Sequence, residues 1–316
     1  MITAEKPLIS IIMSVFDTPD DWLVQSIESI LQQTYENLEF IIIDDCCKKS
    51  NQDILEQFKR QDQRIILLKN DDNLGLTKSL NKGLKVARGS FIARIDADDI
   101  SLPDRIERQL ECFQKNNHLA ICGTNFWALI GSQRHPYKVP LGSSKSLKCM
   151  LSWKDVFVHP SVMINADIIR RYNLFYDETF KTAQDYELWC RIRNYGDLMN
   201  IPNRLCVYRV HENQISSKTS NQQAYNRNRI ILKNLKHIGI FCNEERLNIM
   251  LAIMGYENRN IKPYLIIKEL LSLCHKMYAF YGLSSLDSIR EFLWNTFWVF
   301  KHHIFYALQN KSVHNK

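Results

Sequence analysis

At 316 residues, with 45% hydrophobic and 24% charged residues, the chain has an ordinary globular composition and can bury one large core or a domain with an appendage. No run of about 18 apolar residues occurs, which argues against a membrane-spanning helix, and the short mixed start does not resemble a secretory signal. Nine scattered cysteines without metal-ligand spacing favour reduced thiols in a cytosolic protein.

The net charge of +7 is concentrated in the C-terminal third. From Lys218 onward, 14 Lys and Arg oppose 6 Asp and Glu, a net charge of +8, which leaves −1 for the first 217 residues. A nearly neutral body argues against nucleic acid as a partner, and a basic tail favours an acidic surface.

The first hundred residues alternate between apolar runs and helical periodicity. Continuous apolar runs predict buried strands at Leu8–Phe16, Phe40–Ile43, Arg64–Leu68 and Phe91–Ile95. Apolar residues at helical spacing predict helices at Asp20–Gln33, Ile54–Gln61 and Leu74–Ala87. This alternation predicts βαβ units and a mostly parallel sheet, which is an α/β fold.

Acidic residues follow three of these four strands. They are Asp17, then Asp44 and Asp45, then Asp96, Asp98 and Asp99. Ligands of open parallel sheets bind beyond the carboxyl ends of the strands, so these acids are expected at one shared edge. A single aspartate could equally cap a helix, but three converging sets favour a divalent cation and ribose hydroxyls as ligands.

The rest of the body is less regular. Ser101–Asp104 has the pattern of a capping box and predicts a helix start. Further strands are expected at Leu119–Cys122, Phe126–Ile130, Phe157–Ile164 and Leu205–Val210, and helices at Ala166–Tyr172 and Ala183–Asn194.

Beyond Ser217 the pattern changes to helices separated by polar turns, so we expect a domain at 1–216 and a helical basic extension at 217–316. The last helix, Phe292–Leu308, carries seven aromatic residues but is interrupted by polar ones. An aromatic and basic amphipathic helix suits an anionic membrane surface. Packing on the body or on another subunit is the alternative, and the oligomeric state stays open.

The motifs of the body resemble those of a known family. In chain order they are Ser14–Asp17, Ile43–Asp45, Asn73–Asn81, Ala93–Asp99, Val158–Met163, Gln184–Trp189 and Tyr208–His211. This ordered set, over about residues 7–216, is similar to inverting family 2 glycosyltransferases of the GT-A fold, of the bacterial type that builds surface polysaccharides. The resemblance implies a Rossmann-like nucleotide-binding mixed sheet flanked by helices, here with a helical C-terminal extension.

The resemblance also implies a reaction and a cofactor. A sugar would move from a nucleoside diphosphate donor, most readily UDP-linked, to a glycan or lipid-linked glycan, in the cytoplasm or on the inner face of the membrane. Mn²⁺ or Mg²⁺ would hold the diphosphate. Asp98 and His211 would ligate the metal, although His211 could be structural. Asp99 would be a third member of the acidic set, a loop anchor or a helix cap.

The remaining site residues are carried over from the same motifs. The expected nucleotide-sugar-binding residues are Ser14, Val15, Asp17, Asp45, Asn73, Lys78, Asp96 and Ala97, with an ordinary exposed lysine as the alternative for Lys78. Asp185 matches the general base, and its place at a helix N-terminus is expected to lower its pKa. The helix-cap role is its alternative. His159 and Trp153 are candidates for the acceptor cleft.

Two other interpretations stay open. Asp96-x-Asp98 behind a strand has the spacing of an aspartate-based phosphatase loop, although that loop usually follows the first strand. A GT-A module could also bind nucleotide sugar without turnover. The presence of Asp96, Asp98 and Asp185 together argues against that inactive module.

Overall fold

The computed structural model describes residues 6–212, 214, 220–240, 243, 272, 276, 280 and 281. The chain divides into two compact units, one of residues 1–141 and 157–226, the other of residues 142–156 and 227–316. The second unit therefore combines a short internal segment with the C-terminal part of the chain. The expected domain boundary after residue 216 stays a prediction.

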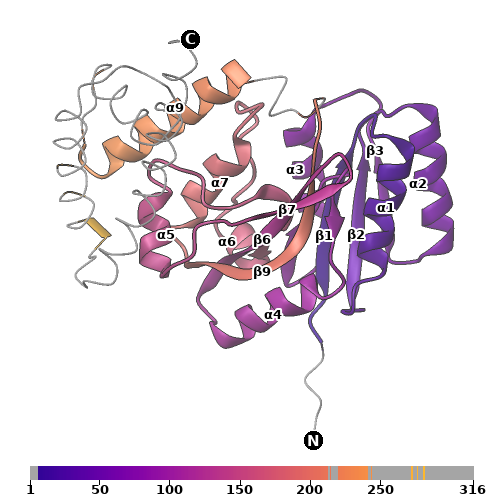
Figure 1. Cartoon of the computed structure of the whole chain (residues 1–316), viewed down its shortest axis with the longest axis horizontal. Helices are drawn as coiled ribbons and strands as arrows, with labels where there is room; N and C mark the ends of the chain where they lie inside the picture. The colour runs from indigo at the N-terminus through magenta and orange to yellow at the C-terminus, as the bar shows by residue number, and fades with distance from the viewer. Residues whose placement is uncertain are drawn as a thin grey trace, which may run out of the picture. The chain divides into compact units, whose positions relative to one another are not determined.

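Half of the sheet is parallel and alternates with helices, as predicted. Its strands are β1 (Ile9–Val15), β2 (Leu38–Asp44), β3 (Ile65–Lys69) and β4 (Phe91–Arg94), in the order β3-β2-β1-β4 (Figure 1). The connecting helices are α1 (Asp20–Leu31), α2 (Lys49–Gln61) and α3 (Leu76–Val86). Both faces of β1 and β2 are almost wholly buried, as expected for inner strands of a sheet with helices on its faces.

The other half of the sheet is mixed. Its strands are β5 (Ile100–Ser101), β6 (Leu119–Ile130), β7 (Gln133–Tyr137), β8 (Met163–Asn165) and β9 (Asp197–Val210). The antiparallel strand β8 links β4 to β6, and β9 runs parallel to β6. The remaining helices of the first unit include α4 (Arg105–Lys115), the 3-10 turn η1 (His159–Ser161), α6 (Ala166–Arg171) and α7 (Gln184–Ile192).

Several predicted boundaries were wrong in this half. Residues 119–130 form one strand rather than two, because irregularities in its pairing with β9 near Asn125 absorb the break in the apolar pattern. Of the strand expected at Phe157–Ile164, only Met163 and Ile164 belong to a strand, β8, and η1 interrupts the rest, since Pro160 has no N–H to give to a ladder. Ser101 belongs to β5, and α4 begins four residues later without a side-chain cap.

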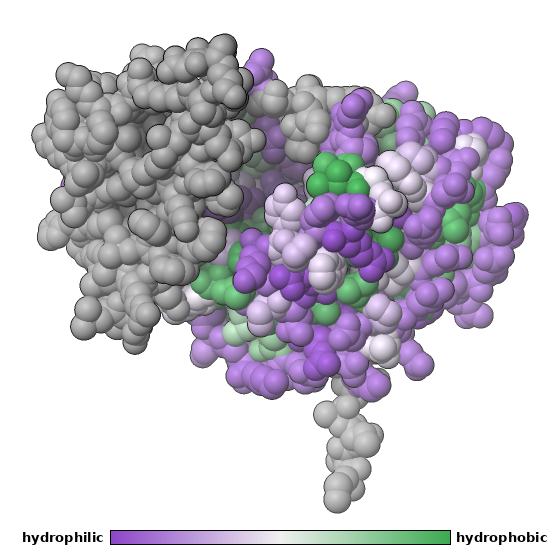
Figure 2. All heavy atoms as spheres, in the orientation of Figure 1, coloured by the Kyte–Doolittle hydropathy of each residue, from purple (hydrophilic) through white to green (hydrophobic). Residues whose placement is uncertain are grey.

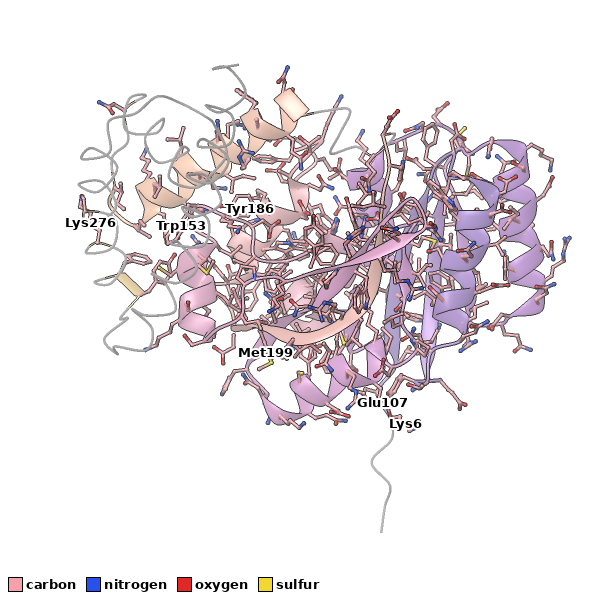
Figure 3. All side chains as sticks on the ribbon, viewed as in Figure 1. Lys6, Glu107, Trp153, Tyr186, Met199 and Lys276 are labelled. Carbon is pink, nitrogen blue, oxygen red and sulfur yellow. The ribbon has the colours of Figure 1, made fainter. Side chains whose placement is uncertain are left out.

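The core of the first unit lies between the sheet and its helices. Leu23, Ile27 and Ile30 of α1 are fully buried in this cluster, which also contains Ile106 and Phe113 of α4. Each such side chain contributes about 1.5–3 kcal/mol on burial. Figure 3 shows how densely side chains fill this space. This packing holds the carboxyl ends of the parallel strands in fixed positions.

The second unit is described only in part. Helix α5 (Ser144–Met150) is capped by Ser143, whose side chain accepts a hydrogen bond from the Ser146 N–H. Helix α9 (Ser220–His237) begins in the first unit and continues into the second, where Asn234 donates to the Leu151 carbonyl at 3.2 Å. The predicted aromatic helix Phe292–Leu308 lies outside the described residues.

The surface of the described residues in Figure 2 is mostly hydrophilic, with hydrophobic residues in small groups. Within the described residues, none of the helices combines the length and the apolar character needed to cross a bilayer.

Candidate active site

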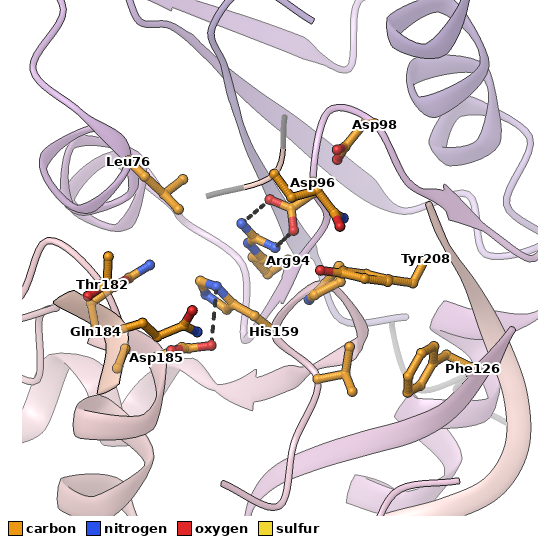
Figure 4. A pocket seen from close by; sticks show the side chains of 15 residues that line it. Leu76, Arg94, Asp96, Asp98, Phe126, His159, Thr182, Gln184, Asp185 and Tyr208 are labelled. Carbon is orange, nitrogen blue, oxygen red and sulfur yellow. Dashed lines mark hydrogen bonds and ion pairs between the residues drawn. The ribbon is translucent and has the colours of Figure 1, made fainter. Parts of the chain in front are cut away.

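Two adjoining cavities lie beyond the carboxyl ends of the parallel strands, both within the first unit. The first cavity, of about 500 Å³, is lined by residues that include Ser14, Asp17, Trp22, Asp45, Asn73, Ala97 and His211. The second cavity, of about 340 Å³, is lined by residues that include Arg94, Phe126, His159, Gln184, Asp185 and Tyr208 (Figure 4). Leu76, Asp96, Asp98 and Gln214 line both cavities, so the acids after β4 stand at the junction.

Asp45 fixes the loop that forms one wall of the first cavity. Its carboxylate accepts hydrogen bonds from the backbone N–H groups of Leu74 and Gly75 at 2.8 and 2.9 Å, and from Asn70 at 2.8 Å. Gly75 has a φ of 82°, a conformation that glycine adopts without strain. Although Asp45 lines the cavity as expected, its oxygens are engaged by the protein.

The other predicted nucleotide-binding residues are mostly brought together. Asp17, in the left-handed region at φ 46°, is exposed and accepts a hydrogen bond from the Lys48 N–H at 2.8 Å. Val15 contributes its carbonyl to the Asp45 N–H at 2.9 Å. Lys78 is exposed on α3 and lines neither of the two cavities, which fits the alternative of an ordinary surface lysine.

The acids after β4 are close enough to share a cation. Asp96, Asp98 and Asp99 each offer an oxygen within 4.8 Å of the others. Asp98 Oδ2 and His211 Nε2 share a hydrogen bond of 2.8 Å, so the two predicted metal ligands are in contact. The His211 ring packs against Trp22, with centroids 5.0 Å apart.

Asp99 anchors the acidic loop to the sheet. Its Oδ1 accepts a hydrogen bond from the Arg209 N–H on β9 at 2.9 Å, while its buried Oδ2 has no partner among the described residues. Burial raises the pKa of Asp99 well above its usual range, and the nearby charges of Asp98 and Asp96 raise it further. The expectation of a loop anchor fits this geometry, whereas a cap on α4 does not, because that helix begins at Arg105.

These donors fit a hard divalent ion. Carboxylate oxygens suit Mg²⁺ and Mn²⁺, and a single imidazole is compatible with Mn²⁺. The buried Oδ2 of Asp99 has no hydrogen-bond partner among the described residues, so it is an acceptor that a cation could use. Asp98 and His211 face the first cavity, where a diphosphate has room to approach them.

Arg94 was missed by the sequence reasoning. It ends β4, its side chain is 4% exposed, and its guanidinium pairs with both carboxylate oxygens of Asp96. Figure 4 shows this fork beneath Asp96, on the floor of the second cavity. A charged residue inside the buried apolar run Phe91–Ile95 was the available signal, since such a charge needs a buried partner.

Burial raises the pKa of Asp96, although the Arg94 charge opposes this effect. Ser26 of α1 donates to the Asp96 carbonyl at 2.9 Å and so holds the backbone of the same residue. Arg94 and Ser26 therefore fix the side chain and the main chain of Asp96 independently.

Asp185 lies on the opposite wall, at the first turn of α7. Its Oδ1 accepts a hydrogen bond from the Tyr186 N–H at 2.9 Å, and the preceding Ala183 is in the left-handed region at φ 57°. Burial raises the pKa of Asp185, outweighing the helix N–H group and the Arg94 charge, which lower it. The expected lowering was therefore wrong, because desolvation dominates at this depth.

His159 stands beside this carboxylate. Its Nδ1 is 3.8 Å from Asp185 Oδ2, and its Nε2 shares a hydrogen bond of 2.8 Å with the Tyr176 hydroxyl. Burial, and then the Arg94 charge, lower the pKa of His159 well below its usual range, so the ring is neutral at pH 7. A neutral imidazole packs against Asp185 without neutralising its charge.

Of the two acceptor candidates, His159 lines the second cavity, whereas Trp153, like Trp189, lines neither of the two cavities. Trp189 is fully buried and packs edge-on against Phe157 and His159, as expected for a core residue. Trp153 belongs to the second unit, where its side chain is buried. Glu187, two residues after Asp185, pairs with Arg191 at 2.7 Å, away from the cavity lining.

Comparison with known proteins identifies the family. Residues 10–171 match the family described as Glycosyl transferase family 2. An uncharacterized glycosyltransferase of Haemophilus influenzae is 31% identical over 301 residues, covering 91% of this chain and 90% of that protein. The putative teichuronic acid biosynthesis glycosyltransferase TuaG of Bacillus subtilis is 28% identical, covering 68% and 84%. The chain belongs to glycosyl transferase family 2 and is a glycosyltransferase.

Solved structures agree on the fold. The structure of S. aureus TarS in complex with UDP-GlcNAc superposes with a TM-score of 0.61 at 13% identity, covering 95% of this chain and 92% of that one. The mannosyltransferase PcManGT from Pyrobaculum calidifontis, in complex with GDP-Man and Mn²⁺, gives 0.57 at 13% identity, covering 90% and 78%. The GT-A architecture expected from the sequence is confirmed, and family membership sets aside the phosphatase alternative.

Proposed function

We propose that this enzyme transfers a sugar, with inversion and with the help of a divalent metal ion, from a UDP-linked donor to a glycan or lipid-linked glycan. The observation that carries the proposal is the junction of the two cavities. Asp96 and Asp98 line both of them, and Asp185 lines only the second. A donor in the first cavity would therefore present its anomeric carbon to an acceptor in the second.

The donor would be held by the strand ends. Ser14, Asp17, Asn73 and Ala97 line the first cavity and offer polar contacts to a base and ribose, with Asp45 fixing the wall behind them. Asp96, oriented by Arg94, would meet the ribose or the metal. The UDP-GlcNAc complex of TarS supports a uridine nucleotide, and the GDP-Man complex of PcManGT makes guanosine the competitor to test.

Mn²⁺ or Mg²⁺ would be held by Asp98 and His211. When bound, such an ion neutralises the diphosphate and stabilises the charge that develops on the leaving group. The Mn²⁺ in the PcManGT complex supports the use of a divalent ion. His211 gains its orientation from Trp22, which packs against the ring.

Asp185 would act as the general base. The acceptor hydroxyl oxygen attacks the anomeric carbon from the face opposite the diphosphate, the bond from that carbon to the diphosphate oxygen breaks, and the hydroxyl proton passes to Asp185. Such a base contributes about 10²–10⁴-fold in rate. His159 lies within 3.8 Å of Asp185 and would hold the carboxylate and the acceptor in place.

The acceptor would belong to cell-surface polysaccharide synthesis, as the name of the relative TuaG suggests. A lipid-linked acceptor would place the enzyme in the cytoplasm against the inner face of the membrane. The excess of positive charge after residue 217 supports this location, because anionic lipids attract basic segments.

The test is a donor panel. UDP-, GDP-, dTDP- and CMP-sugars are added with MnCl₂, MgCl₂ or EDTA, and thermal stabilisation and slow donor hydrolysis are recorded. We expect stabilisation by a UDP-sugar that disappears with EDTA and in Asp98→Asn. Asp53→Asn, an exposed acid paired with Lys49 on α2, is the matched control and should respond as wild type. No response to any donor would overturn the proposal.

A further inference from the structure

Aromatic side chains form one wall of the second cavity. Phe126 on β6 and Tyr208 on β9 line it, with ring centroids 5.9 Å apart in an edge-on arrangement. Figure 4 shows both rings on the wall across from Leu76, Thr182 and Asp185. Neither ring has a role in the donor site or in proton transfer as proposed above.

This wall continues out of the cavity along β7. Phe126 pairs in register with Tyr137, and the two rings stack with centroids 5.4 Å apart and planes at 22°. Ala128 of β6 pairs with His135 of β7 on one side and with Tyr208 of β9 on the other. His135 and Tyr208 therefore lie on the same face of the sheet, with only the small Ala128 side chain between them. Phe126, Tyr137 and Tyr208 together form an aromatic strip that runs from the cavity to the surface.

The outer end of the strip is open. Tyr137 is 50% exposed, and all five residues of β7 are exposed. In the described part of the chain, β7 pairs with β6 alone. An exposed tyrosine already stacked on a partner ring needs little further ordering to bind a ligand.

The chemistry around the strip matches a carbohydrate. A pyranose ring has an apolar C–H face, which packs on an aromatic ring, and a rim of hydroxyl groups, which need hydrogen-bond partners. Polar side chains are available along the same strand face and in the cavity lining. Gln133 and His135 lie on the same face of β7 as Tyr137, and Gln184, Gln214 and Gln223 line the cavity.

We propose that the aromatic strip binds a glycan acceptor of at least two sugars, with the terminal sugar beside Asp185 and the preceding sugar on Tyr137. Tyr137 does not line the cavity, so only an acceptor longer than the sugar inside it reaches that ring. The inference rests on the proposed glycosyl transfer and names the part of the acceptor that the enzyme recognises. A growing oligosaccharide, rather than a monosaccharide, is the substrate.

The experiment measures binding of the full chain, with UDP and MnCl₂ present, to immobilised glycans of one to six sugars attached through their reducing ends. The probes are β-linked N-acetylglucosamine oligomers, β-linked glucose oligomers and bacterial surface oligosaccharides. We expect binding to glycans of two or more sugars to be at least about tenfold tighter than to the matching monosaccharide. Tyr137→Ala should remove this difference, and Tyr137→Phe, which retains the ring, should keep it.

Tyr172→Ala is the matched control. Tyr172 is 42% exposed and stacks on Tyr195 with centroids 3.8 Å apart, but it lines neither cavity. A length preference that survives in Tyr137→Ala, or no binding to any glycan, would overturn the inference. Thermal stabilisation by UDP-sugar, measured on the same preparations, distinguishes a failure of the aromatic-strip inference from a failure of the proposed function. If UDP-sugar still stabilises the protein, only the role of the aromatic strip is wrong. If UDP-sugar does not stabilise it, the proposed function fails as well.

Discussion

At the scale of single residues, the site depends on titratable and charged side chains that are withdrawn from water. Asp185, His159 and Arg94 lie around one cavity, and each is largely withdrawn from solvent. Their burial shifts the pKa of the carboxylate upward and that of the imidazole downward. His159 therefore stays neutral at pH 7 and does not form an ion pair with Asp185, which stays available as the proposed base.

The first prediction concerns the pH dependence of transfer. A general base works only when ionised, so kcat/KM should rise as pH increases through the pKa of Asp185. Because burial raises that pKa, the midpoint of the acid limb should lie above the usual value of about 3.9 for an aspartate. The measurement is kcat/KM against pH with saturating donor.

Asp185→Asn should lower kcat by about 10²–10⁴-fold and leave the donor affinity unchanged. Asp167→Asn, an exposed acid in the first turn of α6, provides the matched control. Equal loss of kcat in both variants, or a loss of donor affinity in Asp185→Asn, would contradict the base assignment.

The second prediction concerns Arg94, which acts as a positioning residue for Asp96. Arg94→Lys keeps a charge but cannot form the planar fork, so the Kd for UDP-sugar should rise about tenfold. Arg94→Met leaves Asp96 without a cation and should also cost about 3–5 kcal/mol of folding free energy. Calorimetric titration gives the Kd, and urea unfolding gives the stability.

Arg170→Lys is the control for this pair, because Arg170 also makes two directed hydrogen bonds, to the carbonyls of Ala87 and Gly89, outside both cavities. If Arg94→Lys binds donor as tightly as Arg170→Lys does, Arg94 has only a structural role.

At the scale of elements, the strands and helices that could be predicted from the sequence were those with a strong local pattern of apolar residues. The strands β1 to β4 were predicted because each is a continuous apolar run, and the acids after them because strand order places their ends together. The charge of Arg94 inside an apolar run indicated a buried partner, but its identity as Asp96 could not be predicted, since it depends on how β8 and η1 pack against β4. The irregular pairing at Asn125 and the failed cap at Ser101 are likewise decided by tertiary contacts with β9.

Strands β1 and β2 are joined to the start of β4 by one buried carboxylate. Glu39 accepts hydrogen bonds from the Ser10 hydroxyl at 2.6 Å and from the Arg88 N–H at 2.7 Å. Ser10 in turn accepts from the Gly89 N–H at 2.8 Å. Gly89 has no room for a side chain, because an added Cβ would lie 2.5 Å from the Ser10 nitrogen.

The third prediction therefore concerns stability against pH. Burial tends to raise the pKa of Glu39, but the hydrogen bonds from Ser10 and Arg88 outweigh it and lower the pKa. The stabilisation is present above the unfolded-state pKa of about 4.3 and is lost as pH falls through the lower folded-state value. Glu39→Gln should cost about 1–3 kcal/mol at pH 7, and this cost should shrink in acid.

Urea unfolding at several pH values measures this difference. Glu36→Gln, an exposed acid three residues earlier, should change stability little at any pH. A cost for Glu39→Gln that is the same at acidic and neutral pH would show that the carboxylate charge is not what the network uses.

At the scale of the whole molecule, charge is divided between a near-neutral body and a basic C-terminal part. Each Lys or Arg near an anionic surface contributes about 1 kcal/mol, and salt screens this attraction. The charge distribution therefore predicts a peripheral enzyme whose membrane binding depends on ionic strength.

The fourth prediction is tested by flotation of the full chain with vesicles. Phosphatidylglycerol vesicles should carry the protein at low salt and release it at about 0.5 M salt. Phosphatidylcholine vesicles are the control and should not bind it. Binding that is equal for both lipids, or absent for both, would contradict the electrostatic account and leave packing or subunit association for the tail.

The second unit is formed from two separate segments of the chain, which has a consequence for folding during synthesis. Residues 142–156 leave the ribosome long before residues 227–316, yet both segments belong to the same unit. Until Asn234 has been made, the buried Leu151 lacks the side chain that donates to its carbonyl at 3.2 Å. The nascent chain must therefore carry residues 142–156 without the rest of their unit while residues 157–226 are made, and translation that stops in this interval leaves a species prone to aggregate.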